Sequence, residues 1–560
     1  MLKNFKKAFS LLIKEEKNKS IIFVFFLLTA SFLELASFSI IFPIIEILVN
    51  KEYTKFDFFL SHFNEEFLVM FLIFAFLILL VLKNIFLMFF YYWQNKFVWK
   101  IYERLSISLL TKYLDKDFHF YFSRNSSELI RNIYVEIKNF SSVITSFIKI
   151  IVESTLLLGI IIILLYLNFK TTILSILIVT ISSTLYLLLF RKFSLRLGET
   201  RLISGGKQIK ALQEIFGAIK DIKLKNSNKM FSDLYRGFTE KFSKAVYLQG
   251  TIMELPKVWL EITFVIILTF SIIFLNYAKI SILEIIPTAA IFVAALFRII
   301  PSANRILSST QNISHNLPSL DKIHTDLLHD IKTKKIFSSN NKNLIFKNSI
   351  NIKNLNYKYP NTEKYIFKNF SCIINKKQFT LIRGDSGSGK TTLIDLISGL
   401  IEPEDGQILC DDESVKNNSF WRKKISYLGQ TVFLLDDTIK KNIAFSFDEK
   451  EIDNRLMNES LDLSALNDFI KPLKNGLNTV VGEKGIRLSG GQIQRIGIAR
   501  ELYRKSEILI FDESTNALDE ETEKGILDCL KEISKSKTVI FISHKKELIK
   551  FADNVIDLSL

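Results

Sequence analysis

The sequence is poor in cysteine, in proline and in charge. Its 560 residues include eight prolines and three cysteines (Cys372, Cys410 and Cys529), and only 23% of them are charged. Three cysteines cannot build a disulfide framework, and their spacing matches no metal site. We therefore interpret them as ordinary small apolar residues of a protein in a reducing compartment. Because 49% of the residues are hydrophobic, a disordered, collagen-like or low-complexity chain is also excluded.

Among the charged residues, basic side chains outnumber acidic ones. Lys and Arg number 73 against 57 Asp and Glu, a formal net charge of +16. Such an excess is typical of proteins that meet nucleic acid, an anionic membrane surface or an acidic substrate. Residues 1–330 hold 37 basic and 25 acidic residues and contribute +12, whereas residues 331–560 contribute +4. Because the excess lies in the more apolar half, we expect contact with membrane lipids and no nucleic acid partner.

Six apolar segments of the first half approach or exceed the roughly 20 residues that a helix needs to cross a bilayer. Buried helices of a large soluble protein are the alternative, but residues 71–82 are apolar on every side, which favours lipid. Residues 1–330 are therefore predicted to form a transmembrane domain with six helices. The predicted spans are Ile21–Val49, Phe67–Trp93, Val143–Leu167, Thr171–Phe190, Val258–Asn276 and Leu283–Ile300.

Loop charges predict the orientation of these spans. The first 20 residues, the 94–142 loop and the 191–257 loop together hold 28 Lys and Arg, and the alternate loops hold four. Basic loops stay in the cytoplasm, so we expect a multi-pass protein of the inner (cytoplasmic) membrane with a cytoplasmic N-terminus and second half. The cytoplasmic loops should continue the spans as helices that turn near 118–122 and 216–220. Residues 51–67, on the outer side, fit either a short interfacial helix or a loop with an aromatic belt.

The second half of the chain changes character. The polar residues 331–349 predict a linker, and residues 350–560 alternate β-rich and helical segments as an α/β domain does. Within them, Gly384-Asp-Ser-Gly-Ser-Gly-Lys-Thr391 follows an apolar strand and opens a helix, the setting of a phosphate-binding loop. Its N–H groups and lysine would face the phosphates of ATP, and Thr391 would bind Mg²⁺. The residues predicted to bind nucleotide in this loop are Gly384, Ser386, Gly387, Ser388, Gly389, Lys390, Thr391 and Thr392.

Two further signals follow along the chain. The apolar strand 508–512 ends in Asp512 and Glu513, which suit magnesium binding and polarisation of an attacking water, although two such acids also fit a helix cap. Between them and the phosphate-binding loop, Leu488-Ser-Gly-Gly-Gln492 opens a helix and offers another anion site.

This last string resembles the signature motif of the ATP-binding-cassette (ABC) family, and nearly the whole chain has the arrangement of ABC exporters. The resemblance implies a membrane α-helical domain of six transmembrane helices fused to an α/β P-loop nucleotide-binding domain, an ATP hydrolase with ATP and Mg²⁺ as cofactors. It also implies a half-transporter: a homodimer is the simplest arrangement, and a heterodimer stays open.

The resemblance assigns roles to single residues. Tyr359 would stack on adenine, Glu513 and His544 would be catalytic, and Gln430 would join Thr391 and Asp512 as a magnesium ligand. The other residues implied at the nucleotide are Ser489, Gly490, Gly491 and Gln492 of the signature and Asp519 of the loop joining the two ATP sites.

Cations in or near the spans are the clue to the transported molecule. The segment 297–306 resembles that of bacterial flippases for lipid-linked oligosaccharides in protein N-glycosylation, which implies that Lys83, Arg298 and Arg305 hold a polyprenyl pyrophosphate head. Arg298 and Arg305 are seven residues apart and share a helical face. Physical reasoning alone favours equally that Lys83 reaches an interface and that the arginines have partners within the chain. The candidate partners are Glu34, Glu46, Glu153 and Glu261.

Other functions share these motifs. An exporter of lipid A, drugs or other amphiphiles would carry the same cassette. An ATP-gated channel or sensor is an alternative of another class, but gating tolerates the loss of hydrolysis, so the presence of Glu513 disfavours it.

Overall fold

The computed structural model describes residues 2–40, 65–167, 169–277, 282–328, 344–360, 362–416, 418–515 and 517–558. The chain divides into two compact units: residues 1–116 with 120–332, and residues 333–560 with the short stretch 117–119. Most of the outer segment 51–67 and of the linker 331–349 lies outside the described residues.

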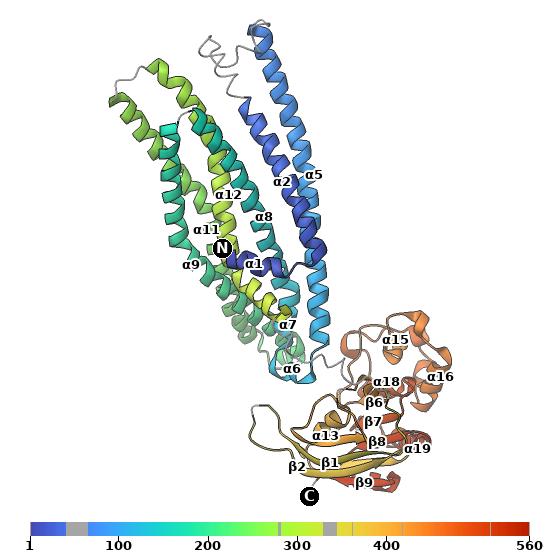
Figure 1. Ribbon diagram of the computed structural model, residues 1–560. Helices are drawn as coiled ribbons and strands as arrows, with labels where there is room; N and C mark the ends of the chain where they lie inside the picture. Colours follow the sequence, from blue (N-terminus) through green and yellow to red (C-terminus); the bar gives the residue numbers. More distant parts are fainter. Residues whose placement is uncertain are drawn as a thin grey trace. The chain divides into compact units, whose positions relative to one another are not determined.

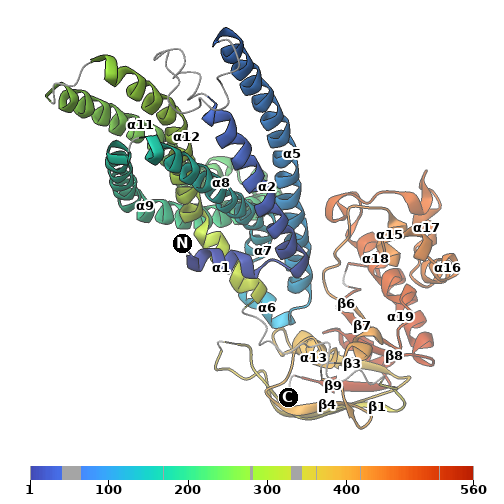
Figure 2. The ribbon, with the colours of Figure 1, turned by 45° about the horizontal axis from the view of Figure 1, so that its top comes forward.

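The first unit is helical throughout its described residues, and its long helices run side by side (Figures 1 and 2). At about 1.5 Å per residue, its helices of 47 to 50 residues are about 70–75 Å long, roughly twice the thickness of a bilayer core. The elements are α1 (Leu2–Ser10), α2 (Lys14–Ser39), α5 (Glu65–Leu114), α6 (Phe118–Ser123), α7 (Ser126–Arg131), the π-helix η1 (Asn132–Glu136), α8 (Ile137–Leu167), α9 (Phe169–Gly217), α10 (Ile219–Leu224), α11 (Asn228–Tyr277) and α12 (Ile282–Leu328).

The predicted spans coincide with these helices. The described parts of the six segments lie in α2, α5, α8, α9, α11 and α12. Within the described residues, three stretches are long and apolar enough to cross a membrane: Met70–Leu114, Ser126–Leu165 and Ser175–Gly217. The number of six spans stays a prediction.

The expected turns below the spans are also present. α5 ends at Leu114 and the short α6 begins at Phe118, while α9 ends at Gly217 and the short α10 begins at Ile219. Both breaks fall at or beside the segments 118–122 and 216–220. The helices therefore continue beyond the apolar stretches before they reverse, as their alternating apolar and polar residues predict.

The second unit is built on two sheets. Five parallel strands lie in the order β6-β7-β8-β3-β9, and four antiparallel strands lie in the order β2-β1-β4-β5. The central strands β7 and β8 are buried along their whole length, which explains their continuous apolar sequences. The strands are β1 (Ser349–Tyr357), β2 (Phe367–Asn375), β3 (Phe379–Arg383), β4 (Asp405–Cys410), β5 (Glu413–Ser414), β6 (Ile425–Leu428), β7 (Ile508–Asp512), β8 (Thr538–Ile542) and β9 (Asn554–Asp557).

Helices, among them α13 and α19, pack beside the parallel sheet, and α15 to α18 form a separate helical group (Figure 2). Separate apolar clusters lie between the two sheets, under α19, and among the helices α15 to α18. The helices are α13 (Lys390–Ile397), α14 (Ser419–Lys423), α15 (Ile439–Ala444), α16 (Asn454–Leu463), α17 (Asn467–Ile470), α18 (Gly490–Tyr503) and α19 (Glu520–Ser534), with 3₁₀ turns η3 (Glu449–Glu451), η4 (Gly476–Asn478), η5 (Glu483–Gly485) and η6 (Lys546–Phe551).

Candidate nucleotide site

The parallel sheet brings the predicted catalytic residues to one edge. Strands β6, β7, β8 and β3 are neighbours, and their last residues are in register, with Leu428 opposite Phe511 and Ile542 opposite both Asp512 and Ile382. Side chains that follow the carboxyl ends of parallel strands share one crevice, where α/β proteins bind ligands. The loops that follow these four strands carry Gly384, Gln430, Glu513 and His544.

The phosphate-binding loop connects β3 to α13 and depends on glycine conformation. Gly387 and Gly389 have φ angles of 83° and 95°, in the left-handed region that favours glycine. A Cβ at Gly389 would also lie 2.5 Å from Cγ2 of Ile366. Lys390 Nζ donates to the carbonyls of Gly384 and Asp385 at 2.8 Å each, so the lysine folds back over the loop that it follows.

The loop has room and polar atoms for a phosphate. Nothing lies within 4 Å of the place of a Cβ on Gly387, and the buried Oγ of Ser388 has no hydrogen-bond partner among the described residues. Tyr359 contacts the start of α13, with its hydroxyl 3.0 Å from Oγ1 of Thr392. These features fit the nucleotide that the sequence predicts at this loop. Its phosphates would face the N-terminus of α13.

Oxygen atoms suited to magnesium lie together beside the loop. Thr391 Oγ1 donates to Oδ2 of Asp512 at 3.1 Å, and the Tyr427 hydroxyl donates to the same oxygen at 3.2 Å. Within the described residues no cluster of three or more His, Cys, Asp or Glu could hold a metal alone. One carboxylate with one hydroxyl is the donor set of a magnesium ion that shares its shell with phosphates and water.

Burial disfavours the ionised form of the acids at this point, against the opposing charge of Lys390 near Asp512. Burial raises the pKa of Asp512, and the charge of Glu513 adds to the effect, although the hydrogen bonds from Thr391 and Tyr427 oppose it. Burial, with the nearby charge of Asp512, also raises the pKa of Asp395 on α13 to about 6. A divalent cation bound here would supply the charge that stabilises the ionised carboxylates.

Glu513 stands where the two flanking loops meet. It leaves β7 with a φ of 48°, an uncommon conformation for a residue that is not glycine, and its backbone N–H donates to the carbonyl of Ile542 at 3.1 Å. Its carboxylate accepts from Nε2 of Gln430 at 3.2 Å and lies 3.6 Å from Nδ1 of His544. The structure thus brings together three residues that are 83 and 31 positions apart along the sequence.

The signature residues form a separate group at the start of α18. Ser489 and Gln492 make a capping box: Ser489 Oγ accepts from the Gln492 N–H at 3.2 Å, and the Gln492 side chain accepts from the Ser489 N–H at 2.9 Å. Cβ positions on Gly490 and Gly491 would lie 3.6 Å and 3.2 Å from Ala517. Asp519 caps α19 by accepting from the Thr522 N–H at 2.9 Å, which lowers the pKa of Asp519.

Sequence reasoning missed some residues of this site. Tyr427 and Asp395 stand on β6 and α13 with no motif of their own, and only the fold places them beside Asp512. Glu523 and Lys545 form an ion pair behind the catalytic loops. Lys545 directly follows His544, and that adjacency is the one sequence signal that could have drawn attention to it.

The three cations proposed for the substrate have different outcomes. Arg305 pairs with Glu153 of α8, with Nε to Oε1 at 2.5 Å and Nη2 donating to Oε2 at 3.1 Å. Glu153 is one of the four candidate partners, so for Arg305 the structure shows the alternative in which the arginine is paired within the chain. Lys83 is half-buried within α5. The side chain of Arg298, on α12, lies outside the described part of the structure.

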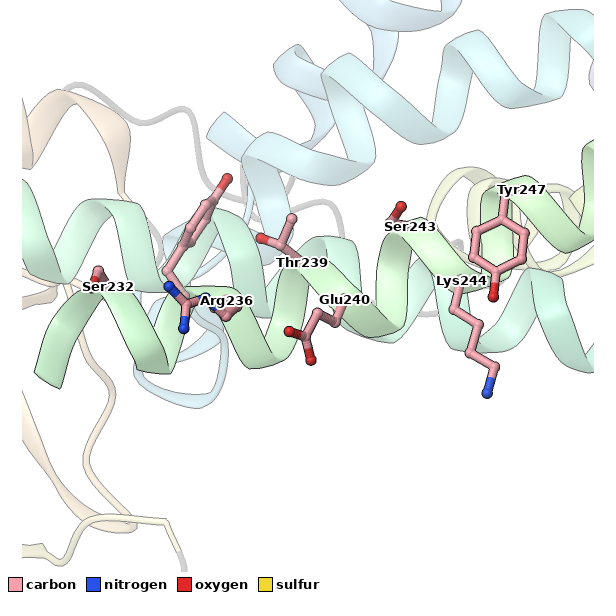
Figure 3. A pocket seen from close by; sticks show the side chains of 8 residues that line it. Ser232, Arg236, Thr239, Glu240, Ser243, Lys244 and Tyr247 are labelled. Atoms are coloured by element: carbon pink, nitrogen blue, oxygen red, sulfur yellow. The ribbon is translucent and has the colours of Figure 1, made fainter. Parts of the chain in front are cut away.

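A hollow of about 650 Å³ lies on α11 of the first unit. All its lining side chains belong to α11, and Figure 3 shows Arg236, Glu240 and Lys244 along one side of that helix. One face of one helix is an open surface, and Arg236 pairs there with Asp233 at 3.0 Å. It offers no convergent catalytic groups, so the nucleotide site remains the candidate.

Comparisons with known proteins agree with this geometry. The model of the ABC transporter family matches residues 367–516. An export ATP-binding/permease protein of Rickettsia bellii is 30% identical over 440 residues, which cover 77% of this chain and 74% of that protein. An ATP-dependent lipid A-core flippase of Cupriavidus pinatubonensis is 24% identical over 463 residues, 81% of this chain and 77% of the flippase.

A solved structure extends the agreement to the fold. The structure of a bacterial Atm1-family ABC exporter with ATP bound superposes with a TM-score of 0.79 at 20% identity, covering 97% of this chain and 93% of that chain. The predicted fold class, a helical membrane domain fused to an α/β P-loop domain, is confirmed. The chain belongs to the ABC transporter family, as a half-transporter of the exporter type whose cassette hydrolyses ATP.

Proposed function

We propose that two copies of this chain form a homodimeric exporter of the inner membrane that flips a polyprenyl-pyrophosphate-linked oligosaccharide by alternating access. In this proposal residues 1–330 form the membrane domain, 331–349 the linker and 350–560 the nucleotide-binding domain. The division of the chain into two compact units next to residue 332 supports these limits.

The positions of the nucleotide-site residues at the carboxyl ends of the parallel strands support a separate role for each of them in ATP hydrolysis. Lys390 and the loop N–H groups would bind the phosphates, Thr391, Asp512 and Gln430 would hold Mg²⁺, and Tyr359 would stack on the adenine. Mg²⁺ would neutralise charge on the transferring phosphoryl group. Glu513 would accept a proton from the attacking water, and His544, 3.6 Å away, would bind the terminal phosphate.

The contribution of the signature would come from the second copy. Ser489, Gly490, Gly491 and Gln492 stand at a helix N-terminus, which attracts anions. Within the chain, Ser489 and Gln492 hydrogen-bond each other, and the two glycines approach Ala517 and Leu518. The N-terminus of α18 would then close a site on the partner chain. Two intact motif sets in one sequence favour a homodimer with two ATP sites.

The observation that supports the substrate assignment is an apolar cavity between α8, α9 and α12, close along the chain to the Arg305–Glu153 ion pair. The ion pair itself is the alternative that the sequence left open for Arg305, so a lipid head group would have to displace Glu153. The cavity has a volume of about 280 Å³, and its lining includes Ile306 and Leu157, which are one and four residues along the chain from Arg305 and Glu153. An apolar cavity whose wall adjoins an arginine in the sequence would suit a lipid with an anionic head. A pyrophosphate could compete with Glu153 for the guanidinium by bidentate hydrogen bonds, because the Arg305 side chain is 40% exposed. Lys83 and Arg298 would add charge to the same head.

Lipid A is the second candidate substrate. The lipid A-core flippase noted above matches far more of this chain than the cassette alone, so the membrane half shares in the similarity. Lipid A is also an anionic amphiphile, and the cavity and ion pair suit it by the same chemistry. The two candidate substrates differ in head group, so an experiment that offers both lipids to the transporter can tell them apart.

Reconstitution in liposomes separates these candidates. We expect ATP-dependent loss of access to a fluorescent polyprenyl-pyrophosphate glycan, a fall of at least about tenfold with Arg305→Ala, and partial activity with Arg305→Lys. Arg196→Ala, which removes an exposed arginine of α9, is the control and should transport normally. If Arg305→Ala still moves the glycolipid while lipid A or drugs are moved faster, the substrate assignment is wrong.

The same liposomes test the channel or sensor alternative. A pump needs hydrolysis in every cycle, whereas gating needs binding alone. Glu513→Gln should therefore abolish translocation while ATP still binds. Translocation that persists in this variant would exclude the pumping mechanism.

A further inference from the structure

Glu523 is a buried acid of the cassette to which no motif assigns a role. It lies in the first turn of α19, and its side chain is 12% exposed. Lys545 Nζ donates to both carboxylate oxygens, at 2.8 Å and 2.6 Å, and the Thr515 hydroxyl donates to Oε1 at 2.7 Å. One carboxylate is thus bound by two segments that are thirty residues apart in the sequence.

Helix formation does not require this acid. Asp519 already caps α19, and the exposed Glu520 and Glu521 already place negative charge in its first turn. Burying the carboxylate costs desolvation that its ion pair with Lys545, whose side chain is 36% exposed, offsets only in good geometry, and a hydrophobic side chain would often stabilise a fold as well. The pair therefore calls for an explanation beyond the stability of the helix.

The two segments that Glu523 joins are those that carry the catalytic pair. Thr515 lies two residues beyond Glu513, and Lys545 directly follows His544. The His544 side chain is 62% exposed, so packing does little to restrain it, and its place is set by the backbone on either side. On one side the Ser543 N–H donates to the carbonyl of Ile382 at 3.2 Å, and on the other side Lys545 is held by Glu523.

We infer that Glu523 is a positioning residue, which acts through Lys545 and Thr515 to hold His544 and Glu513 in mutual register. This inference rests on the proposed roles of those two residues in hydrolysis. Because the Glu523 N–H donates to the carbonyl of Asp519, the N-cap of α19, the same residue also ties the loop proposed to join the two ATP sites to the histidine segment.

Kinetics of the full-length transporter in proteoliposomes test the inference. Lys545→Met keeps the aliphatic stem and removes the charge; it should lower kcat by on the order of tenfold to a hundredfold, the cost of misplacing a catalytic group by about 1 Å. The KM for ATP and the affinity for a non-hydrolysable analogue should stay within about twofold. Lys545→Arg, which can bind the carboxylate in bidentate fashion, should recover most of kcat.

A matched control lies at the other end of the same helix. Lys535 pairs with Glu532 at 2.6 Å, but both side chains are about 70% exposed, so Lys535→Met should leave kcat unchanged. If Lys545→Met folds poorly, Thr515→Val removes one hydrogen bond with little change of shape and should lower kcat about threefold. Unchanged kcat in Lys545→Met or in Thr515→Val, or equal loss in the Met and Arg variants, would overturn the inference.

A double-variant cycle identifies the route of the effect. If Glu523 and Lys545 act through the histidine, then Lys545→Met should cause little further loss in a His544→Ala background. Fully additive losses would show that the pair has a separate, structural role. Failure of the proposed function looks different: Glu513→Gln would then retain ATP hydrolysis, whatever Lys545→Met does.

Discussion

Two buried groups of charged residues, one in each unit, are built on opposite principles. In the first unit, Glu136 of η1 is 1% exposed and is bound by Arg201 of α9 at 3.2 Å and by Ser319 of α12 at 2.5 Å, with Arg131 at 3.7 Å. In the second unit, Asp512, which is 5% exposed, accepts hydrogen bonds from two neutral hydroxyls. One acid has its cations within the chain, and the other has a raised pKa.

The difference separates structural charge from functional charge. The Glu136 group joins η1, α9 and α12 below the apolar stretches, where apolar packing alone would not fix which polar faces meet. It sits on a π-helical turn, a feature that often marks functional or adjustable points in helices. The Asp512 group lies at the carboxyl end of the central strand β7, where Mg²⁺ and phosphates can supply the missing ligands and charges.

Removing the catalytic acid should have the largest effect. Glu513→Gln keeps the size of the side chain and a hydrogen-bonding oxygen, but the amide cannot accept a proton from water. We expect ATP hydrolysis to fall by on the order of a thousandfold, within the range for general base catalysis, with unchanged ATP binding and thermal stability. Glu521→Gln, an exposed acid on α19, is the control. A variant that loses ATP binding or unfolds early would place Glu513 among the structural charges instead.

Breaking the structural group should act on stability. Glu136→Gln leaves two buried arginines without their counter-charge, which we expect to cost about 3 kcal/mol and to lower the unfolding temperature of the detergent-solubilised protein. Lys210→Gln breaks an exposed pair with Glu214 on α9 and should cost under about 0.5 kcal/mol. Equal shifts in the two variants would contradict the assignment of Glu136 as a buried structural charge.

The nucleotide site could be read from the sequence because its residues follow short apolar strands. A phosphate-binding loop, a strand that ends in Asp512 and Glu513, and a histidine after another strand must meet when parallel strands share one edge. The structure places Gln430 and His544 against Glu513, although their catalytic roles stay predictions. Tyr427 escaped notice because a tyrosine within a strand has no spacing to mark it.

The first unit was less predictable in its contacts than in its helices. Long apolar segments predict helices whatever their neighbours are. The sequence leaves four glutamates as candidate partners of Arg305, and the structure shows that the partner is Glu153. Arg201 and Ser319, the partners of Glu136, are 65 and 183 positions away from it in the sequence. Helical periodicity gives the face of each helix but not the rotation and depth at which two faces meet.

The smallest of the expected effects concerns glycine, which the two units use differently. In the phosphate-binding loop Gly389 is needed for its positive φ, whereas Gly198 stands inside α9, where alanine is ordinarily the better residue. A Cβ on Gly198 would lie 1.9 Å from the backbone carbonyl oxygen of His315 on α12, and a backbone atom in a packed helix cannot turn aside. Gly198→Ala should therefore force α9 and α12 apart and cost about 1–3 kcal/mol.

Gly250 supplies the matched comparison because it lies within α11 with nothing within 4 Å of its Cβ position. Gly250→Ala should raise stability by up to about 1 kcal/mol through helix propensity alone. Opposite shifts of the unfolding temperature, measured on the two variants in the same detergent, would show that close helix approach, and not conformational freedom, explains the glycine on α9. Two stabilising shifts would mean that α9 and α12 do not meet as closely as their backbones indicate.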